Sequence, residues 1–168
     1  MNRLRLGVFF FFCACLVTSS QVGDKWIVRE DGIGPVKVGM TLDQLEATLQ
    51  EKLTEEESGN DSCYYVHGRR RPHISFMIID NHVVRIDVDA PGIPASSGIQ
   101  VGDSETHART IYGPNLKVTA HKYVDTGHYL TVRAGSGRYG IRFETDKGKI
   151  TSFYAGTYEA IQYVEGCE

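Results

Sequence analysis

The sequence predicts an α+β fold built as a tandem repeat of two small units, each a helix followed by an antiparallel β-sheet. Three observations predict it. Two segments carry similar helix-start signals, a run of strand patterns follows each, and a Pro-, Gly- and Ser-rich segment separates the halves. The 168 residues and the ordinary globular composition fit one domain or two very small ones.

The N-terminal leader has the composition of a secretory signal. Arg3 and Arg5 precede an uncharged run at residues 6–17, and small residues follow as far as Ser20. The run is shorter than the roughly 18 residues that a spanning helix needs. The leader therefore predicts cleavage after Ser20 and a secreted or periplasmic protein. The alternative is lipoprotein processing at Cys15, which would attach the chain to a membrane.

The first helix is expected to begin at Thr41. Thr41 and Gln44 have the spacing of a capping box, and Leu45, Leu49 and Leu53 recur every four residues as one apolar stripe. The polar residues that follow Leu53 predict a loop.

The second helix is expected to begin at Ser104. Ala108, Ile111 and Tyr112 form its apolar stripe, and Gly113 with the proline behind it predicts its end. Although the Gly-Asp-Ser sequence here resembles an esterase motif, a helix N-cap explains Ser104 without a nucleophile.

Short strands are expected after each helix. Alternation is clearest where Ile86 and Val88 would face the core while Asp87 and Asp89 would be solvated on the outer face. Strands are predicted at 64–67, 74–79, 83–89, 116–122, 129–133, 139–144, 150–155 and 160–164. The predicted domain organisation is a signal peptide (1–20), a first α+β repeat (21–89), a linker (90–98) and a second α+β repeat (99–168).

Two related sequences open the predicted helices and resemble those of known families: Val-Gly-Met-Thr at residues 38–41 and Val-Gly-Asp-Ser at residues 101–104. A helix opened in this way and followed by an antiparallel sheet resembles the small lipoprotein of the outer-membrane β-barrel assembly machine, and in tandem the β-lactamase-inhibitor protein. The ending at residues 163–167 resembles uncharacterised secreted bacterial proteins. The likeness of this ending does not indicate any particular activity.

The net charge argues against nucleic-acid binding, and the cysteines outside the leader indicate a disulfide. The formal net charge is −3 and the isoelectric point is near 6.1, so no basic field favours nucleic acid. Two cysteines, Cys63 and Cys167, lie outside the leader, and in an oxidising compartment they are expected to form a structural disulfide.

Two groups of residues are the predicted binding site. Arg69, Arg70 and Arg71 form the one strong charge run, suited to an anionic or acidic partner. Tyrosine is enriched in protein interfaces and is frequent in the second half of the chain. The tyrosines predicted to bind are Tyr123, Tyr129, Tyr139 and Tyr154.

The predicted function is therefore non-catalytic binding of a protein or cell-envelope component through a sheet face, with no cofactor, metal, catalytic residue or nucleic acid. The alternative is a small-ligand- or metal-binding protein or a hydrolase. In that case His121 and His128, at the two ends of a hairpin loop, would act with nearby carboxylates.

Overall fold

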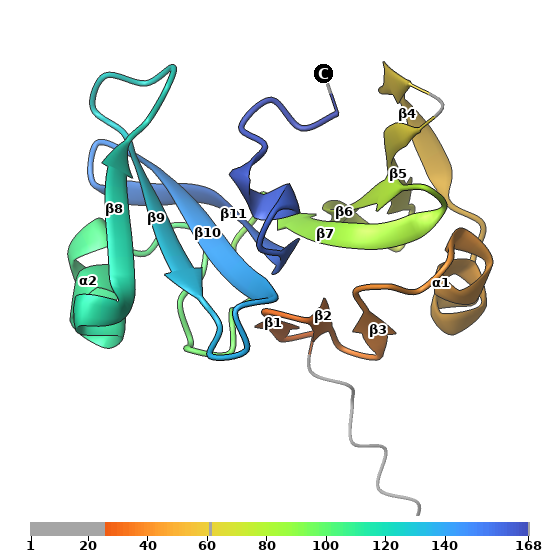
Figure 1. The fold of residues 1–168 in the computed structure, drawn as a ribbon, viewed down its shortest axis with the longest axis horizontal. Helices are drawn as coiled ribbons and strands as arrows, with labels where there is room; N and C mark the ends of the chain where they lie inside the picture. The colour runs from red at the N-terminus through yellow and green to blue at the C-terminus, as the bar shows by residue number, and fades with distance from the viewer. Residues whose placement is uncertain (1–25, 61, 168) are drawn as a thin grey trace, which may run out of the picture.

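The computed structural model describes residues 26–60 and 62–167, which contain one large antiparallel sheet (Figure 1). Its eight strands have the order β4-β5-β6-β7-β11-β10-β9-β8. Their bounds are β4 (Thr54–Asn60), β5 (Cys63–Gly68), β6 (Arg71–Ile79), β7 (His82–Val88), β8 (Leu116–Ala120), β9 (His128–Arg133), β10 (Tyr139–Asp146) and β11 (Lys149–Thr157).

The remaining elements are short. The helices are α1 (Leu42–Leu49), α2 (Glu105–Tyr112) and the 3₁₀ turns η1 (Gly113–Asn115) and η2 (Ala160–Gln162), and a small sheet comprises β1 (Val28–Arg29), β2 (Gly32–Ile33) and β3 (Val36–Lys37). Figure 1 shows α1, α2 and the small sheet on one side of the large sheet and the C-terminal segment on the other.

The predicted fold class is wrong, because the molecule is dominated by this single sheet rather than by tandem helix-plus-sheet units. Each half of the chain supplies four strands, and β7 pairs with β11 in the middle, with Ile86 opposite Ala155. Separate sheets would leave the backbone groups along β7 and β11 unpaired, and pairing these edges satisfies them. The two halves therefore form one structure.

The prediction for the first helix start is confirmed, but its end differs. Thr41 Oγ1 accepts a hydrogen bond from the backbone N–H of Gln44, and the Gln44 side chain accepts one from the backbone N–H of Thr41, at 3.3 and 3.0 Å. The helix ends at Leu49 because Gln50 adopts a left-handed conformation, with φ of 54°. The polar segment predicted as a loop is instead the edge strand β4, where one face needs no apolar residues.

The second helix also begins as predicted, with Ser104 Oγ accepting a hydrogen bond from the backbone N–H of His107 at 3.1 Å. Both helix starts rest on a hairpin turn. The backbone N–H of Leu42 donates to the carbonyl oxygen of Asn81, and that of Glu105 donates to the carbonyl oxygen of Gly148. Both turns place residues at positive φ, as tight hairpins require.

The two faces of the sheet differ in character. On one face, strand residues such as Ile86 and Phe143 pack with Leu45 of α1 and Ala108 of α2 in the main hydrophobic core. The opposite face, here called the polar face, carries the alternate side chains, many of them charged or aromatic.

The C-terminal segment at residues 158–167, here called the strap, crosses the polar face. A strand was predicted at 160–164, and this is wrong, since the residues form η2 and an irregular tail. Ala160 and Cys167 pack there with Tyr65 and Met77 in a second, smaller cluster. The strap is thus a cover for part of the polar face.

The predicted leader, its cleavage site and Cys15 lie outside the described residues. Within the described part of the chain, no helix is long and apolar enough to cross a membrane.

Candidate binding site on the polar face

The centre of the polar face is a buried ion pair between two residues of β7. Arg85 donates to Asp87 through two hydrogen bonds of 2.8 and 2.7 Å, a bidentate arrangement. The Arg85 side chain is 5% exposed and that of Asp87 is 25% exposed. Asp87 was predicted to be solvated, and this is wrong because the strap and neighbouring tyrosines exclude water from this part of the face.

Two tyrosines enclose this ion pair. The Arg85 guanidinium lies 4.1 Å from the ring centroid of Tyr154 and 5.7 Å from that of Tyr65, so both rings make cation–π contacts. Burial raises the pKa of each tyrosine hydroxyl, and their hydroxyl groups therefore stay protonated as hydrogen-bond donors.

Burial also raises the pKa of Asp87, while the charge and hydrogen bonds of Arg85 oppose the rise. Glu144 of β10 adds to it by charge repulsion. The polar face thus holds two carboxylates close enough to interact.

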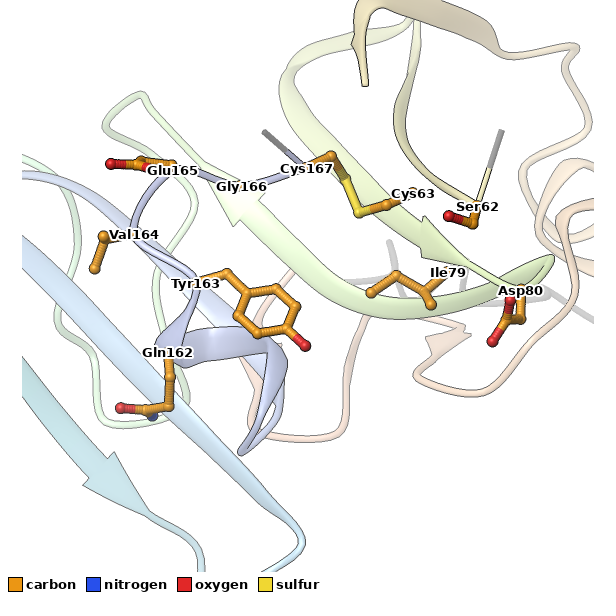
Figure 2. Close-up of a pocket in the computed structure, with 10 residues that line it drawn as sticks. All are labelled: Ser62, Cys63, Ile79, Asp80, Gln162, Tyr163, Val164, Glu165, Gly166 and Cys167. Carbon is orange, nitrogen blue, oxygen red and sulfur yellow. A yellow bond between two sulfur atoms is a disulfide. The ribbon is translucent and has the colours of Figure 1, made fainter. Parts of the chain in front are cut away.

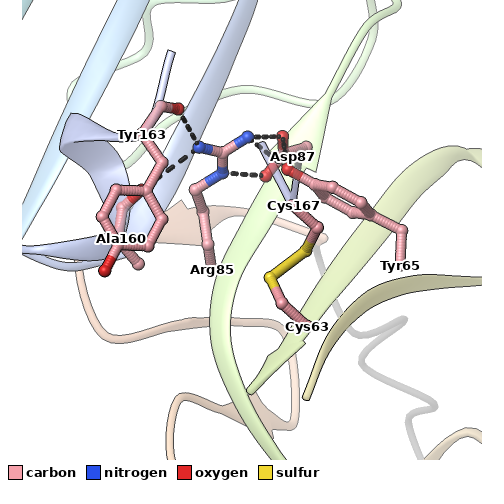
Figure 3. The surroundings of a disulfide bond; sticks show 7 residues. All are labelled: Cys63, Tyr65, Arg85, Asp87, Ala160, Tyr163 and Cys167. Atoms are coloured by element: carbon pink, nitrogen blue, oxygen red, sulfur yellow. Dashed lines mark hydrogen bonds and ion pairs between the residues drawn. A yellow bond between two sulfur atoms is a disulfide. The ribbon is translucent and has the colours of Figure 1, made fainter. Parts of the chain in front are cut away.

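Arg85 joins the sheet to the strap as well. Its Nη1 donates to the carbonyl oxygens of Ala160 and Tyr163, at 3.2 and 2.7 Å (Figure 3). Next to it, the predicted Cys63–Cys167 disulfide is present, with 5.3 Å between the two Cα atoms. The disulfide is compatible with a protein that folds outside the cytoplasm.

A broad groove lies between the end of the strap and the sheet. It has a volume of about 610 Å³ and lies beside the disulfide (Figure 2). Ile79 and Asp80 line one side, and Tyr163, which is 38% exposed, lines the other. The residues that line the groove are partly polar and partly apolar.

A smaller cavity opens where the strap leaves the polar face uncovered. Its volume is about 250 Å³. Carboxylates dominate its charge, with Arg85 as the buried counter-ion. The polar side chains lining it are His73, Ser75, Arg85, Asp87, Asp89, Glu144, Ser152 and Tyr154.

Glu144 connects this cavity to His121. Its carboxylate accepts a hydrogen bond of 2.9 Å from the hydroxyl of Tyr154, and its second oxygen lies 3.3 Å from Nε2 of His121. The imidazole of His121 stacks on the ring of Tyr129, with 4.4 Å between centroids. The partners on both sides of Glu144 hold its carboxylate in one position.

His121 and His128, the histidines of the predicted alternative, do not come together. His128 lies on the helix-covered face, where its Nδ1 is 3.0 Å from the carboxylate of Glu105 in α2. Tyr129, the next residue along β9, faces the other way and contacts His121. Among the residues that the structure describes, no group of three His, Cys, Asp or Glu side chains could hold a metal ion.

The four predicted binding tyrosines lie in different environments. Tyr129 and Tyr154 are 5% and 4% exposed, so their rings pack inside the molecule and are not part of an exposed surface. Tyr139 is half-buried, and Tyr123, in the loop between β8 and β9, is 58% exposed. The sequence showed where tyrosines are frequent but not which of them the strap and neighbouring strands would cover.

The predicted arginine run forms the hairpin between β5 and β6, with Gly68 opposite Arg71 and the other two arginines in the turn. Arg69 and Arg70 are exposed, whereas Arg71 is half-buried with its guanidinium 3.5 Å from the ring centroid of Trp26. A cavity of about 230 Å³ beside this hairpin shares His73 with the cavity of about 250 Å³ on the polar face.

Arg85, Asp87 and Glu144 are the site residues that sequence reasoning missed. A signal was available, since Arg85 and Asp87 interrupt an apolar strand that lies in the centre of the sheet. A charged side chain in a central strand is either solvated or paired, and the pairing depends on the strap, which is distant in sequence.

No protein-family model and no curated protein matches the sequence. Among solved structures, the chain is similar to the uncharacterized protein yfeY from Escherichia coli, with a TM-score of 0.52 and 14% identity over 77% of this chain and 99% of that one. It is also similar to a cysteine-rich secretory protein from Staphylococcus aureus subsp. aureus Mu50, with a TM-score of 0.40 and 11% identity over 84% of this chain and 54% of that one. The likeness to yfeY shows the fold alone, and the second likeness carries no argument. The resemblance to the barrel-assembly lipoprotein and the β-lactamase-inhibitor protein stays a prediction.

Proposed function

We propose that this chain is a non-catalytic binding protein that acts outside the cytoplasm, secreted or in a periplasm, and engages a protein or cell-envelope partner. The binding surface is the uncovered end of the polar face with the adjoining arginine hairpin. One observation carries the proposal: the strap covers one end of the polar face, and the cavity at the other end continues through His73 to Arg70 and Arg71.

The size of the cavity supports binding of a partner's side chain rather than of a whole small molecule. Small-molecule sites occupy about 300–1,000 Å³, and this cavity, at about 250 Å³, is smaller. A cavity of this size accepts one anchoring group while the surrounding surface contacts the rest of the partner, as at protein interfaces.

The chemistry of the surface also supports binding. Asp87 is held by Arg85, and Glu144 is held by Tyr154 and His121, so each carboxylate has a fixed orientation. Fixed polar groups lower the entropy lost on binding.

The test is a substitution that fills the cavity without removing any of the charged network. Ser152→Trp places a large ring into the cavity from β11, and no other group depends on the Ser152 hydroxyl for a hydrogen bond among the described residues. The control is Ser136→Trp, which adds the same ring at the exposed turn between β9 and β10 and removes one exposed hydrogen bond, from the backbone N–H of Arg138 to the Ser136 hydroxyl. Both variants should fold, as circular dichroism would check.

Binding is measured by co-sedimentation with cell-envelope fragments from the organism that produces the protein. We expect Ser152→Trp to weaken binding at least tenfold and Ser136→Trp to leave it within twofold, since a few central contacts carry most interface energy. Equal binding by both variants would place the site elsewhere, and no sedimentation of the unaltered protein would reject the proposed function.

A further inference from the structure

The arginine hairpin carries three adjacent cations, Arg69, Arg70 and Arg71. Among the side chains that the structure describes, none forms an ion pair with Arg69, Arg70 or Arg71 or accepts a hydrogen bond from them. Glu51, whose carboxylate lies over Gly68 at the base of the hairpin, acts on Arg71 only at longer range. Within the described part of the chain, the three cations therefore have no ion-pair partner and are available to an anionic partner.

Trp26 orients one of these cations. Its ring occupies one face of the Arg71 guanidinium, at 3.5 Å. A stacked guanidinium keeps the N–H groups along its edge free, and this planar set of donors matches the oxygens of a phosphate. The stack thus presents Arg71 as an oriented phosphate-binding group beside the two exposed arginines of the turn.

The shape of the patch favours a broad, flat partner. Arg69 and Arg70 are exposed in the two-residue turn, and Pro72 is exposed near the start of β6. Trp26 and Ile93 are half-buried beside them. Basic side chains with an amphipathic tryptophan and an aliphatic residue are the combination that binds at membrane surfaces.

The negative charge of the rest of the chain favours one orientation of the protein on an anionic surface. The formal net charge is −3 although this hairpin is strongly basic. An anionic surface therefore attracts the hairpin and repels the rest of the molecule, so that one orientation is favoured.

We propose that the Arg69–Arg71 hairpin and Trp26 dock the protein on a lipid surface that carries anionic phosphate headgroups. This proposal rests on the proposed function, because it names the chemistry of the envelope partner at the same end of the sheet.

The fluorescence of Trp26 reports vesicle binding directly, because Trp26 is the single tryptophan of the chain and lies in the patch itself. The protein lacking residues 1–20, the form expected after cleavage, is titrated with vesicles of phosphatidylcholine alone and of phosphatidylcholine mixed with phosphatidylglycerol. Both Trp26 emission and co-sedimentation are recorded. Binding to the anionic vesicles should shift the emission to shorter wavelength.

The variant is Arg69→Gln with Arg70→Gln. Its matched control is Lys117→Gln with Arg138→Gln, and both of these residues are exposed and distant from the hairpin.

We expect the unaltered protein to bind the anionic vesicles and not the neutral ones. Each arginine removed should weaken binding roughly fivefold, about 25-fold for the pair, whereas the control pair should change it less than threefold. All variants carry the same N-terminal residues, so a difference between them comes from the hairpin.

Equal binding to neutral and anionic vesicles, or equal binding by both double variants, would overturn the lipid proposal. If the protein sediments with envelope fragments but not with either vesicle, and Arg69→Gln with Arg70→Gln abolishes that sedimentation, the partner is an acidic protein. In that case the lipid proposal fails and the proposed function stands.

Discussion

Arg85 and Tyr163 are 78 residues apart in sequence, and the Nη1 atom of Arg85 donates a 2.7 Å hydrogen bond to the carbonyl oxygen of Tyr163. The same guanidinium binds both carboxylate oxygens of Asp87. One side chain in the middle of the sheet therefore holds the strap and neutralises the buried acid of the candidate site.

The first prediction concerns this residue. Arg85→Met removes the charge but keeps most of the volume, and leaves Asp87 buried without its cation. We expect a loss of about 3–5 kcal/mol in the free energy of unfolding, because an unpaired buried charge is costly. Urea denaturation measures it, with Arg138→Met at an exposed position as the control.

The matching double variant separates charge from packing. Adding Asp87→Leu to Arg85→Met removes the orphaned carboxylate and should recover part of the stability. No recovery would mean that the strap contacts of Arg85, rather than its pairing with Asp87, account for the loss.

The second prediction concerns the disulfide. Thiol titration of the denatured, unreduced protein lacking residues 1–20 should find no free thiol, since Cys63 and Cys167 are joined. Replacing both by serine should lower the free energy of unfolding by up to about 4.7 kcal/mol, the chain-entropy value for a loop near 100 residues. Two free thiols in the unaltered protein would contradict the pairing.

The third prediction is a pH dependence at Glu105. Burial would raise its pKa, but hydrogen bonds from Arg109, Thr145 and His128 outweigh burial and lower its pKa from the ordinary 4.5. A lowered pKa in the folded state stabilises the protein above the unfolded-state pKa, and the gain disappears as the pH falls through the folded-state pKa.

Glu105→Gln should therefore cost about 1–3 kcal/mol near pH 7 and much less at pH values below about 4. Urea denaturation at several pH values measures the difference from the unaltered protein. Glu55→Gln, at an exposed position of β4, is the control and should show little effect at any pH. A cost for Glu105→Gln that does not vary with pH would show that the carboxylate charge plays no part.

The fourth prediction concerns the central strand pair. A Cβ atom on Gly156 of β11 would lie 2.2 Å from the carbonyl oxygen of Val84 in β7, so alanine cannot be accommodated unless the strands move apart. We expect Gly156→Ala to cost at least about 3 kcal/mol. Gly135→Ala adds the same methyl group in open space and should change stability by less than about 0.5 kcal/mol.

Local signals in the sequence predicted many of the elements. The caps at Thr41 and Ser104 and the turns at residues 80–81 and 147–148 are determined by neighbouring residues, and they are present. The joining of the two halves was missed because pairing between β7 and β11 depends on residues that are distant in sequence. Periodicity reports which face of a strand is buried but not which strand lies beside it.

The candidate site was less predictable than the fold, for the same reason. The arginine hairpin could be found as a charge run, and its turn lies at the surface. Tyr129 and Tyr154 could not be recognised as buried, because their partners lie elsewhere in the sequence. His121 is in the loop after β8, and Glu144 and Arg85 are on other strands. Hydrogen bonds across a sheet leave no pattern in a single sequence.

The pairing of β7 with β11 also has a consequence for the order in which the chain folds. Neighbouring strands within each half are consecutive hairpins, whereas this pair joins residues such as Ile86 and Ala155. Local hairpins form quickly, and contacts between distant residues form late. Until β11 is available, β7 is therefore an open sheet edge bearing Val83, Ile86 and Val88, the kind of edge that pairs with other chains and aggregates. A nascent chain that stops before β11 would need a chaperone to protect that edge.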